Sequence, residues 1–291
     1  MRRFLSGKRN GKLEDRRLSV SKTTYDLKAS IQAEPGNLIN NLTEKILNTE
    51  QFDVDQLKRQ NPLYNALIPH EILKTSHLER QFETLIGGVW ESLAVVVAQH
   101  YLGFAQKHKR ISGVIKQERL HRITETLNQL EFDQTDGNRV QPNWDRELEY
   151  ILEGAGEEIP TQVICDLYVE NTSNDSNYAF ELKEPLPNSD QTKVSKEKIL
   201  KLYAMEPRQI AHAFFALPYN PYGQRENYEW SVPARWFNMK EDRVVLIGDE
   251  FWDKVGGPGT FQVIIEIASE VGQGYKERIY REYLGIEPPT E

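Results

Sequence analysis

The sequence contains a single cysteine, Cys165, among 291 residues. One cysteine cannot form a disulfide within the chain, and proteins of reducing compartments keep their thiols free. This scarcity excludes a small disulfide-stabilised secreted fold and indicates a cytoplasmic protein. The position of Cys165 next to Asp166, in an apolar segment, favours a small buried side chain over a catalytic nucleophile.

Long apolar runs are also absent. The longest, Leu93–Ala98, spans six residues, whereas a membrane-spanning helix needs about 20. The N-terminal residues lack the apolar core of a secretory signal. Hydrophobic residues make up 38% of the chain and charged residues 27%. We therefore expect no membrane association, and a globular chain large enough for one or two domains.

The sequence also has no overall excess of positive charge. The formal net charge is −8, whereas nucleic-acid binders tend to carry basic footprints. The charge is nevertheless uneven. Residues 1–28 hold nine Lys and Arg against three acids, and residues 193–201 hold four Lys against one Glu. We expect residues 1–24 to form a basic arm that either contacts DNA or has no task, followed by a helical segment over 25–75.

A β-hairpin is predicted over residues 162–183. Two segments, Gln162–Val169 and Tyr178–Leu182, alternate apolar and polar residues around a cluster of Asn, Ser and Asp. Asp166 lies in the first segment, and Glu181 and Lys183 stand two positions apart at the end of the second. Side chains two apart on a strand leave the same face, so a carboxylate and a lysine would meet there with Asp166 nearby.

Two carboxylates and a lysine are the minimum equipment for metal-dependent phosphodiester hydrolysis. Mg²⁺ takes oxygen ligands and often uses one or two carboxylates, with water and substrate phosphate completing its shell. A lysine beside it could orient a water or offset charge on phosphorus. An isolated Glu-x-Lys is more often an ordinary surface pair, so the hairpin and Asp166 carry the hypothesis.

Helices are predicted upstream and downstream of the hairpin. Residues 77–101 and 111–131 show apolar residues at helical spacing, and Glu91 lies near the apolar stripe of the first. Glu91 is either an outer ligand of the metal or a solvated boundary residue. Residues 191–205 form a further helix whose early lysines suit either a phosphate or water. Buried strands follow at 211–217 and 243–248, and closing helices at 260–271 and 275–284.

The candidate DNA contacts lie after the hairpin. Residues 219–236 are rich in aromatics, Asn, Gln and Arg, and Arg pairs well with guanine while Asn and Gln pair with adenine. A loop pinned by its own aromatics is an equal reading of this segment. The candidates there and on the preceding helix are Gln191, Lys193, Lys196, Asn220, Arg225 and Arg235.

Three blocks of sequence carry a resemblance to a known family. They are GGVWESLA at 87–94, ELKEPLPNSDQTKVSKEKILKLYA at 181–204 and FFALPYNPYG at 214–223. Together they resemble the TdeIII/MjaII-type Type II restriction endonucleases across about residues 75–270. The order of elements looks like the PD-(D/E)xK restriction-endonuclease-like fold. That resemblance implies an α/β protein with a mixed sheet flanked by helices, a mainly helical N-terminal part, and a nuclease domain over 76–291.

The resemblance also implies roles for particular residues. Asp166 and Glu181 would hold Mg²⁺, Lys183 would assist the attacking water, and Glu91 would match a helix glutamate of such nucleases. Cys165 stands where the motif has proline. The family further implies a homodimer that cuts double-stranded DNA at a short palindrome, GGNCC being the candidate, with a cognate methyltransferase in the same system.

Two other functions stay open on the sequence alone. A structure-selective repair nuclease could use the same fold and the same three residues, and would cut at branches or ends rather than at fixed sites. A non-catalytic DNA-binding protein could carry the carboxylates incidentally, since fold does not dictate function. Metal-dependent cutting into discrete fragments distinguishes the restriction endonuclease from both.

Overall fold

The computed structural model describes residues 33–49, 55, 58, 59, 62–132, 134, 135 and 138–289. The expected basic arm at 1–24 lies outside them. The chain divides into two compact units, one of Met1–Leu85 with Pro258–Glu291 and one of Ile86–Gly257. The second unit contains the sheet, the predicted hairpin and every candidate side chain. The functional boundaries expected at residues 24 and 75 stay predictions.

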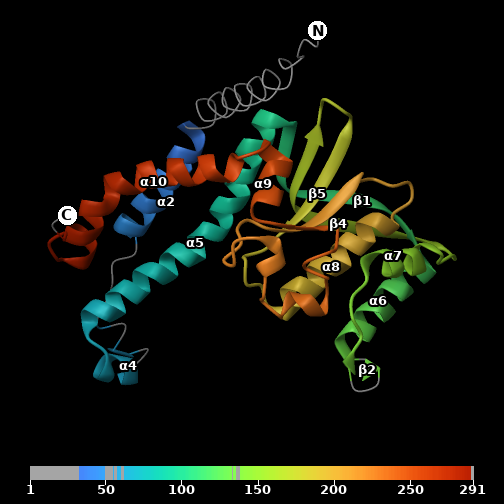
Figure 1. Ribbon diagram of the computed structural model, residues 1–291, viewed down its shortest axis with the longest axis horizontal. Helices are drawn as coiled ribbons and strands as arrows, with labels where there is room; N and C mark the ends of the chain where they lie inside the picture. The colour runs from blue at the N-terminus through green and yellow to red at the C-terminus, as the bar shows by residue number, and fades with distance from the viewer. Residues whose placement is uncertain are drawn as a thin grey trace, which may run out of the picture. The chain divides into compact units, whose positions relative to one another are not determined.

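A five-stranded mixed sheet forms the centre of the Ile86–Gly257 unit (Figure 1). The strands lie in the order β1-β4-β5-β6-β7; the β1–β4 and β4–β5 pairs are antiparallel, whereas β5–β6 and β6–β7 are parallel. This sheet and its flanking helices confirm the predicted α/β restriction-endonuclease-like class. The strands are β1 Gly103–Lys116, β4 Glu158–Asn171, β5 Ser176–Leu182, β6 His212–Leu217 and β7 Val245–Ile247.

Strand β1 corrects one sequence prediction. A helix was expected over 111–131, but the chain stays extended to Lys116 and the helix α6 covers only Gln117–Phe132. Ile111 and Ile115 are four residues apart, a spacing that fits a helix and a strand equally. Pairing with β4 along nearly its whole length decides for the strand, because tertiary contacts override local propensity.

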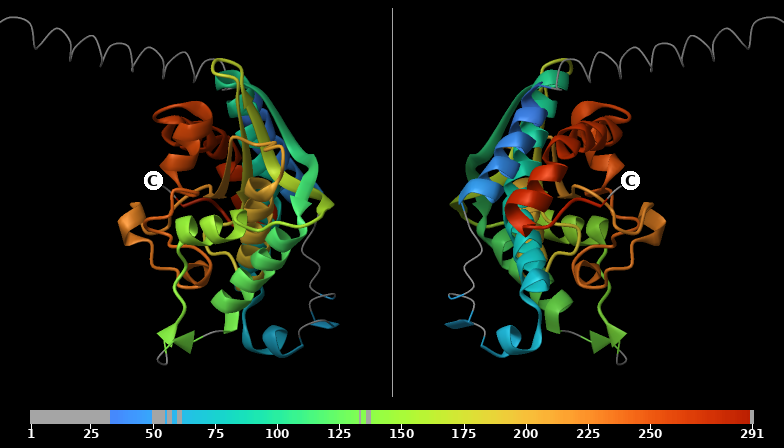
Figure 2. Two further views of the ribbon diagram at one scale, coloured as in Figure 1. Left: turned by 90° about the vertical axis from the view of Figure 1, so that its right-hand side faces the viewer. Right: turned by 90° about the vertical axis from the view of Figure 1, so that its left-hand side faces the viewer.

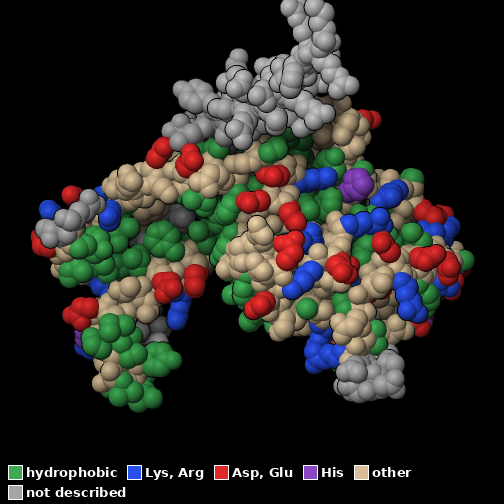
Figure 3. Space-filling model, viewed as in Figure 1, with side chains coloured by type: hydrophobic (Ala, Val, Ile, Leu, Met, Phe, Trp, Pro, Cys, Tyr) green, Lys and Arg blue, Asp and Glu red, His purple; other side chains and the backbone are tan. Residues whose placement is uncertain are grey.

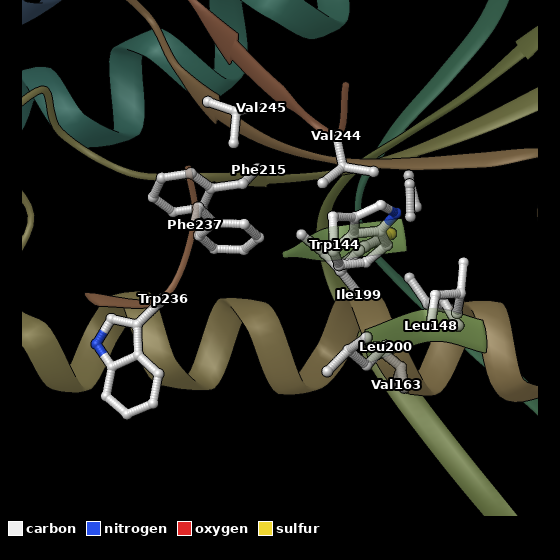
Figure 4. Close-up of a cluster of buried hydrophobic side chains, with 14 of the residues drawn as sticks. Trp144, Leu148, Val163, Ile199, Leu200, Phe215, Trp236, Phe237, Val244 and Val245 are labelled. Carbon is white, nitrogen blue, oxygen red and sulfur yellow. The ribbon is translucent and has the colours of Figure 1, made fainter. Parts of the chain in front are cut away.

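One face of the sheet is covered by α6, α7 (Trp144–Leu152) and α8 (Ser189–Ala204), which Figures 1 and 2 show on the same side of the strands. Asn188 and Gln191 start α8 with a reciprocal capping box, which satisfies backbone donors at the helix end. Between α8 and the sheet, Phe215 stacks on Phe237 with centroids 4.9 Å apart (Figure 4). This dry core fixes the height of α8 above the strands.

The opposite face packs against α9 (Asp249–Gly256) and the C-terminal part of α5 (His70–Tyr101). Phe180 of β5 stacks on Phe214 of β6, and Phe251 of α9 meets the Phe180 ring edge-on. Trp90 of α5 lies against Trp252, with ring centroids 5.9 Å apart. These aromatic contacts place Glu91, the residue after Trp90, beside the sheet.

The other unit is helical and includes α2 (Ala33–Thr49), α4 (Pro62–Leu67), α10 (Thr260–Arg278) and the π-helical turn η3 (Ile279–Leu284). The two predicted closing helices form one continuous rod, because Gly272 and Gly274 are accommodated within α10. Arg278 forms an ion pair with Glu44 of α2. Hydrophobic side chains gather on the surface of α4 (Figure 3), where Leu63 and Leu67 are exposed.

Helix α5 is the one described helix long and apolar enough, by length and composition, to cross a membrane. The core helix of a soluble protein can have the same length and composition. Leu93, Ala94, Val97 and Ala98 of α5 are buried in the protein. Packing within the fold therefore accounts for the apolar side chains in the C-terminal part of the helix.

Candidate active site

Asp166 and Glu181 lie where β4 and β5 separate. The antiparallel pairing of these strands begins at Leu167 opposite Phe180, so both carboxylates come directly beyond the last paired residues. On its other side β5 continues in parallel with β6, and the Lys183 N–H donates to the Ala216 carbonyl at 3.0 Å. The end of β5 is therefore hydrogen-bonded to β6 on one side and no longer paired with β4 on the other.

The structure brings the three motif side chains together at this opening. Lys183 Nζ lies 2.6 Å from Asp166 Oδ2 and 3.6 Å from Glu181 Oε2. The backbone N–H of Leu182 also donates to Asp166 Oδ2 at 2.9 Å. Asp166 is thus fixed to the backbone of β5, and a single ammonium group bridges both carboxylates. The catalytic roles of these residues stay predictions.

Glu181 is almost fully buried, with 1% of its surface exposed. Burial first, and the neighbouring Asp166 carboxylate second, raise the pKa of Glu181 to about 7, while Lys183 and Lys198 act in the opposite direction. A buried carboxylate is costly without a cationic partner. The pKa of Glu181 stays raised although Lys183 and Lys198 are its cationic partners, so further positive charge from a divalent cation would stabilise its ionised form.

Lys198 is a member of the site that the sequence analysis did not select. Its Nζ lies 2.9 and 3.0 Å from the two carboxylate oxygens of Glu181. The sequence showed only a basic run at the start of α8. The signal that could have identified it is its position around the helix. Ser195 and Ile199 face the protein interior, and Lys198 lies next to them at the edge of that buried face.

Glu91 of α5 lies at the same site. Burial first, and then the Asp166 carboxylate, raise the pKa of Glu91, while His108, Lys107 and Lys183 lower it. A cavity of about 270 Å³ opens beside these groups, and we call it the catalytic cleft. It is lined by Gly87, Trp90, Glu91, Leu182, Lys183, Glu184, Leu186, Pro187, Gln191 and Pro218.

The donor set suits a hard divalent cation. No group of three or more His, Cys, Asp and Glu side chains in the described ranges is already arranged around one point. Mg²⁺ does not require such a group, because one or two carboxylates suffice when water and substrate phosphate supply the other oxygens. Asp166 and Glu181 provide two carboxylates, and Glu91 lies near enough to interact with Asp166. The residues present therefore fit the metal.

Cys165 has no part in this chemistry. Its side chain is fully buried, and burial raises the pKa of its thiol to about 12. A thiol in that state is a poor nucleophile and a poor metal ligand. The residue acts as a small apolar side chain beneath α8.

Two candidate DNA contacts are occupied within the protein. The Lys196 side chain is fully buried, pairs with Glu147 at 2.5 Å and donates to the Trp236 carbonyl. The Arg225 guanidinium pairs with Glu250 at 2.9 Å and donates to the carbonyls of Met239, Asp242 and Val245. A DNA contact by either cation would compete with these bonds, and the role of both residues in binding DNA stays a prediction.

The other four candidates lie in four different settings. Gln191 is exposed and lines the catalytic cleft. Asn220 Nδ2 is buried without a hydrogen-bond partner among the described residues. Arg235 is half-buried and forms no ion pair within the described part of the chain. Lys193 is half-buried, pairs with Glu131 and lies over the Trp236 ring.

Comparison with known proteins identifies the class. Residues 28–272 match the family model described as Type II restriction endonuclease, HinfI. The Type II restriction enzymes HgiCII and HgiBI of Herpetosiphon aurantiacus are 28% and 27% identical to this chain, over 77% of it and 81% of each relative. A third enzyme of that organism, HgiEI, is 28% identical with the same coverage.

These findings decide between the three functions that the sequence left open. They confirm the predicted class of Type II restriction endonuclease, whereas the narrower TdeIII/MjaII-type assignment is not confirmed, because the matching model is that of HinfI. The match covers all of the strands and the whole catalytic cleft. The chain belongs to the HinfI family of Type II restriction endonucleases, which are site-specific deoxyribonucleases.

Proposed function

We propose that this protein hydrolyses phosphodiester bonds of double-stranded DNA at a short palindromic site and that it requires Mg²⁺. The observation that supports this proposal best is the meeting of Asp166, Glu181 and Lys183 at the open end of β4 and β5. Family membership supplies the class of reaction, and this geometry supplies a place for it. The catalytic cleft beside the three side chains gives a substrate phosphate access.

Each residue has a distinct task in this proposal. Asp166 and Glu181 hold the cation, and the Leu182 N–H keeps the Asp166 carboxylate oriented toward the site. The cation, when bound, polarises the scissile phosphate and makes water a better nucleophile. Lys183 orients the attacking water and offsets negative charge that develops on the phosphorus oxygens. Glu91 supports the arrangement from α5, and cleavage leaves 5′-phosphate ends.

Sequence recognition is assigned to residues 219–236 together with the start of α8. Arg235 is the candidate for a bidentate contact to guanine, and Asn220 and Gln191 are candidates for amide contacts to adenine. Lys193 would contact a backbone phosphate. GGNCC, the site implied by the TdeIII/MjaII-type resemblance, is the first sequence to test, since a G-rich half-site suits Arg235.

The proposed biological unit is a homodimer, because a palindrome presents the same half-site twice and a two-fold protein matches it. Leu63 and Leu67 on α4 expose apolar surface that a second copy could cover. We further propose a cytoplasmic location and a cognate methyltransferase acting on the same site. The proposed nuclease domain spans 76–291, after a helical segment over 25–75 and a basic arm over 1–24.

Digestion of a sequenced plasmid tests the proposal directly. In Mg²⁺ the protein should give discrete fragments whose mapped ends share one short palindrome. The Asp166→Ala and Lys183→Ala variants should give no fragments while still binding the same DNA in Ca²⁺. Undiminished cutting by either variant, or cutting without any divalent cation, would contradict the proposal. Cutting only at branches or ends would favour a structure-selective nuclease.

A further inference from the structure

Strand β1 contains a backbone irregularity directly across from the active site. In the register of β1 with β4, Lys107 lies opposite Leu167 and Lys109 opposite Cys165, so His108 lies opposite Asp166. His108 has φ of +51°, a left-handed conformation that is uncommon for residues other than glycine. Such conformations persist where the surroundings enforce them, and they cluster at functional sites.

The irregularity changes where β1 points its side chains. Successive residues of a regular strand face opposite sides of the sheet. Here Lys107 and His108 both reach α5: Lys107 Nζ donates to Ser92 Oγ at 3.0 Å, and His108 Nε2 lies 3.4 Å from Glu91 Oε2. Two consecutive nitrogen-bearing side chains thus contact α5 at Ser92 and at Glu91, and Glu91 lines the catalytic cleft; we call their position the cleft rim.

The next two basic residues of β1 do not share this direction. Lys109 lies over the Tyr168 ring, with its Nζ 4.9 Å from the centroid. Arg110 donates to Gln162 on the neighbouring strand at 3.2 Å. The basic run Lys107–Arg110 is therefore divided. Lys107 and His108 lie near the cleft, whereas Lys109 and Arg110 contact residues of the neighbouring strand.

His108 near the cleft is open to a large ligand, and Lys107 beside it is half-buried. The His108 side chain is 62% exposed, and β1 is the last strand in the sheet order. Burial and Asp166 raise the pKa of Glu91, and the charges of His108, Lys107 and Lys183 oppose that rise, so Lys107 is close enough to affect Glu91 at the cleft. Positive groups on an accessible rim beside metal-binding carboxylates suit a polyanion that must approach those carboxylates.

We propose that Lys107 and His108 form a phosphate-binding site for the DNA backbone, adjacent to the phosphate that is cut. Lys107 supplies a positive charge and His108 an imidazole N–H donor. Contacts of this kind fix the register of the duplex and carry no sequence information. The inference rests on the proposed function, since it names a further contact of the same substrate.

Salt dependence of DNA binding tests this site without cleavage. The probes are two short fluorescein-labelled duplexes, one containing GGNCC and one lacking it, titrated in Ca²⁺ between 50 and 200 mM salt. The variants are Lys107→Gln, His108→Asn and His108→Gly; Asn and Gly both tolerate the left-handed backbone, so the strand keeps its shape. Arg110→Gln is the matched control, because it removes a charge from the same strand but not from the cleft rim.

We expect Lys107→Gln to reduce the slope of log K against log salt by about 0.9, the loss of one phosphate contact, and to weaken both duplexes equally. His108→Asn and His108→Gly should weaken both duplexes as well, whereas Arg110→Gln should leave slope and affinity unchanged. An unchanged slope for Lys107→Gln, or an equal loss in Arg110→Gln, overturns the inference. If the wild-type protein binds neither duplex, the proposed function itself fails, which is a distinguishable result.

Discussion

The ammonium group of Lys198 lies 2.9 and 3.0 Å from the two carboxylate oxygens of Glu181. Glu181 therefore has a lysine on either side, one from the strand end and one from α8. Lys183 can meet substrate in the catalytic cleft, which it lines. Lys198 does not line that cleft, so its contribution passes through the carboxylate that it holds.

Replacing Lys198 should impair the site without dismantling the fold. We expect Lys198→Ala to lower Ca²⁺ affinity and cleavage by about 10- to 100-fold, the usual effect of losing a residue that orients a metal ligand. Lys198→Arg should recover part of both. Isothermal titration with Ca²⁺ and a plasmid cleavage rate in Mg²⁺ measure the two effects. Lys201→Ala is the control, because Lys201 pairs with Glu197 on the same helix.

Replacing Lys183 should separate chemistry from binding. Lys183→Ala removes the ammonium that neighbours both carboxylates, and we expect cleavage to fall by at least about 10²–10³-fold, the loss typical of one transition-state donor. DNA affinity in Ca²⁺ should change little. Single-turnover cleavage and fluorescence anisotropy measure the two quantities. A parallel loss of affinity would mean that Lys183 serves mainly to bind DNA.

The stabilising effect of a divalent cation should grow with pH. In the metal-free fold the pKa of Glu181 is raised from 4.5 to about 7, so the folded state keeps this proton where the unfolded state has lost it. That contribution to stability is complete below pH 4.5 and disappears as the pH rises through 7. Ca²⁺ requires the ionised carboxylate, so the increase in Tm caused by Ca²⁺ should be larger at pH 8 than at pH 6. Glu181→Gln should remove most of this pH dependence.

Removing one member of the buried Lys196–Glu147 pair should destabilise the protein. Burial lowers the pKa of Lys196 and Glu147 raises it, so the pair keeps a charge in the core. Lys196→Met leaves Glu147 without its cation, and we expect a loss of about 3–5 kcal/mol in the free energy of unfolding. Urea denaturation measures the loss. The double variant Lys196→Met/Glu147→Leu should be more stable than the single one.

Replacing Arg225 should lower stability, whereas replacing Arg235 should weaken DNA binding. Arg225→Ala removes bonds to Glu250 and to three carbonyls, so unfolding should become easier by about 1.5–3 kcal/mol. Arg235→Ala should leave the unfolding midpoint in place and weaken binding to the cognate duplex. Paired urea melts and anisotropy titrations check both. If Arg225→Ala changed the preferred DNA sequence without lowering the free energy of unfolding, Arg225 would be a DNA contact after all.

The meeting of the three motif side chains could be predicted from sequence better than the sheet that carries them. Asp166, Glu181 and Lys183 are close along the chain, and the alternation in their own strands was enough to place them together. The strand β1 was missed because its partner, β4, lies some fifty residues further on, and Ile111 and Ile115 fit a helix as well. Lys198 was missed because nothing local ties α8 to β5. The partners of Lys196 and Arg225 within the protein could not be predicted either, because sequence does not show which cations are enclosed.

The chain after β6 is held in place by hydrogen bonds from two side chains to backbone carbonyl oxygens. Lys196 donates to the carbonyl of Trp236, and Arg225 donates to those of Met239, Asp242 and Val245. Every amino acid offers that acceptor, so these bonds do not depend on which side chain the accepting residue carries. Exposed side chains of the proposed recognition segment, residues 219–236, could therefore change and alter the target sequence, while the candidate catalytic residues on β4 and β5 stay as they are.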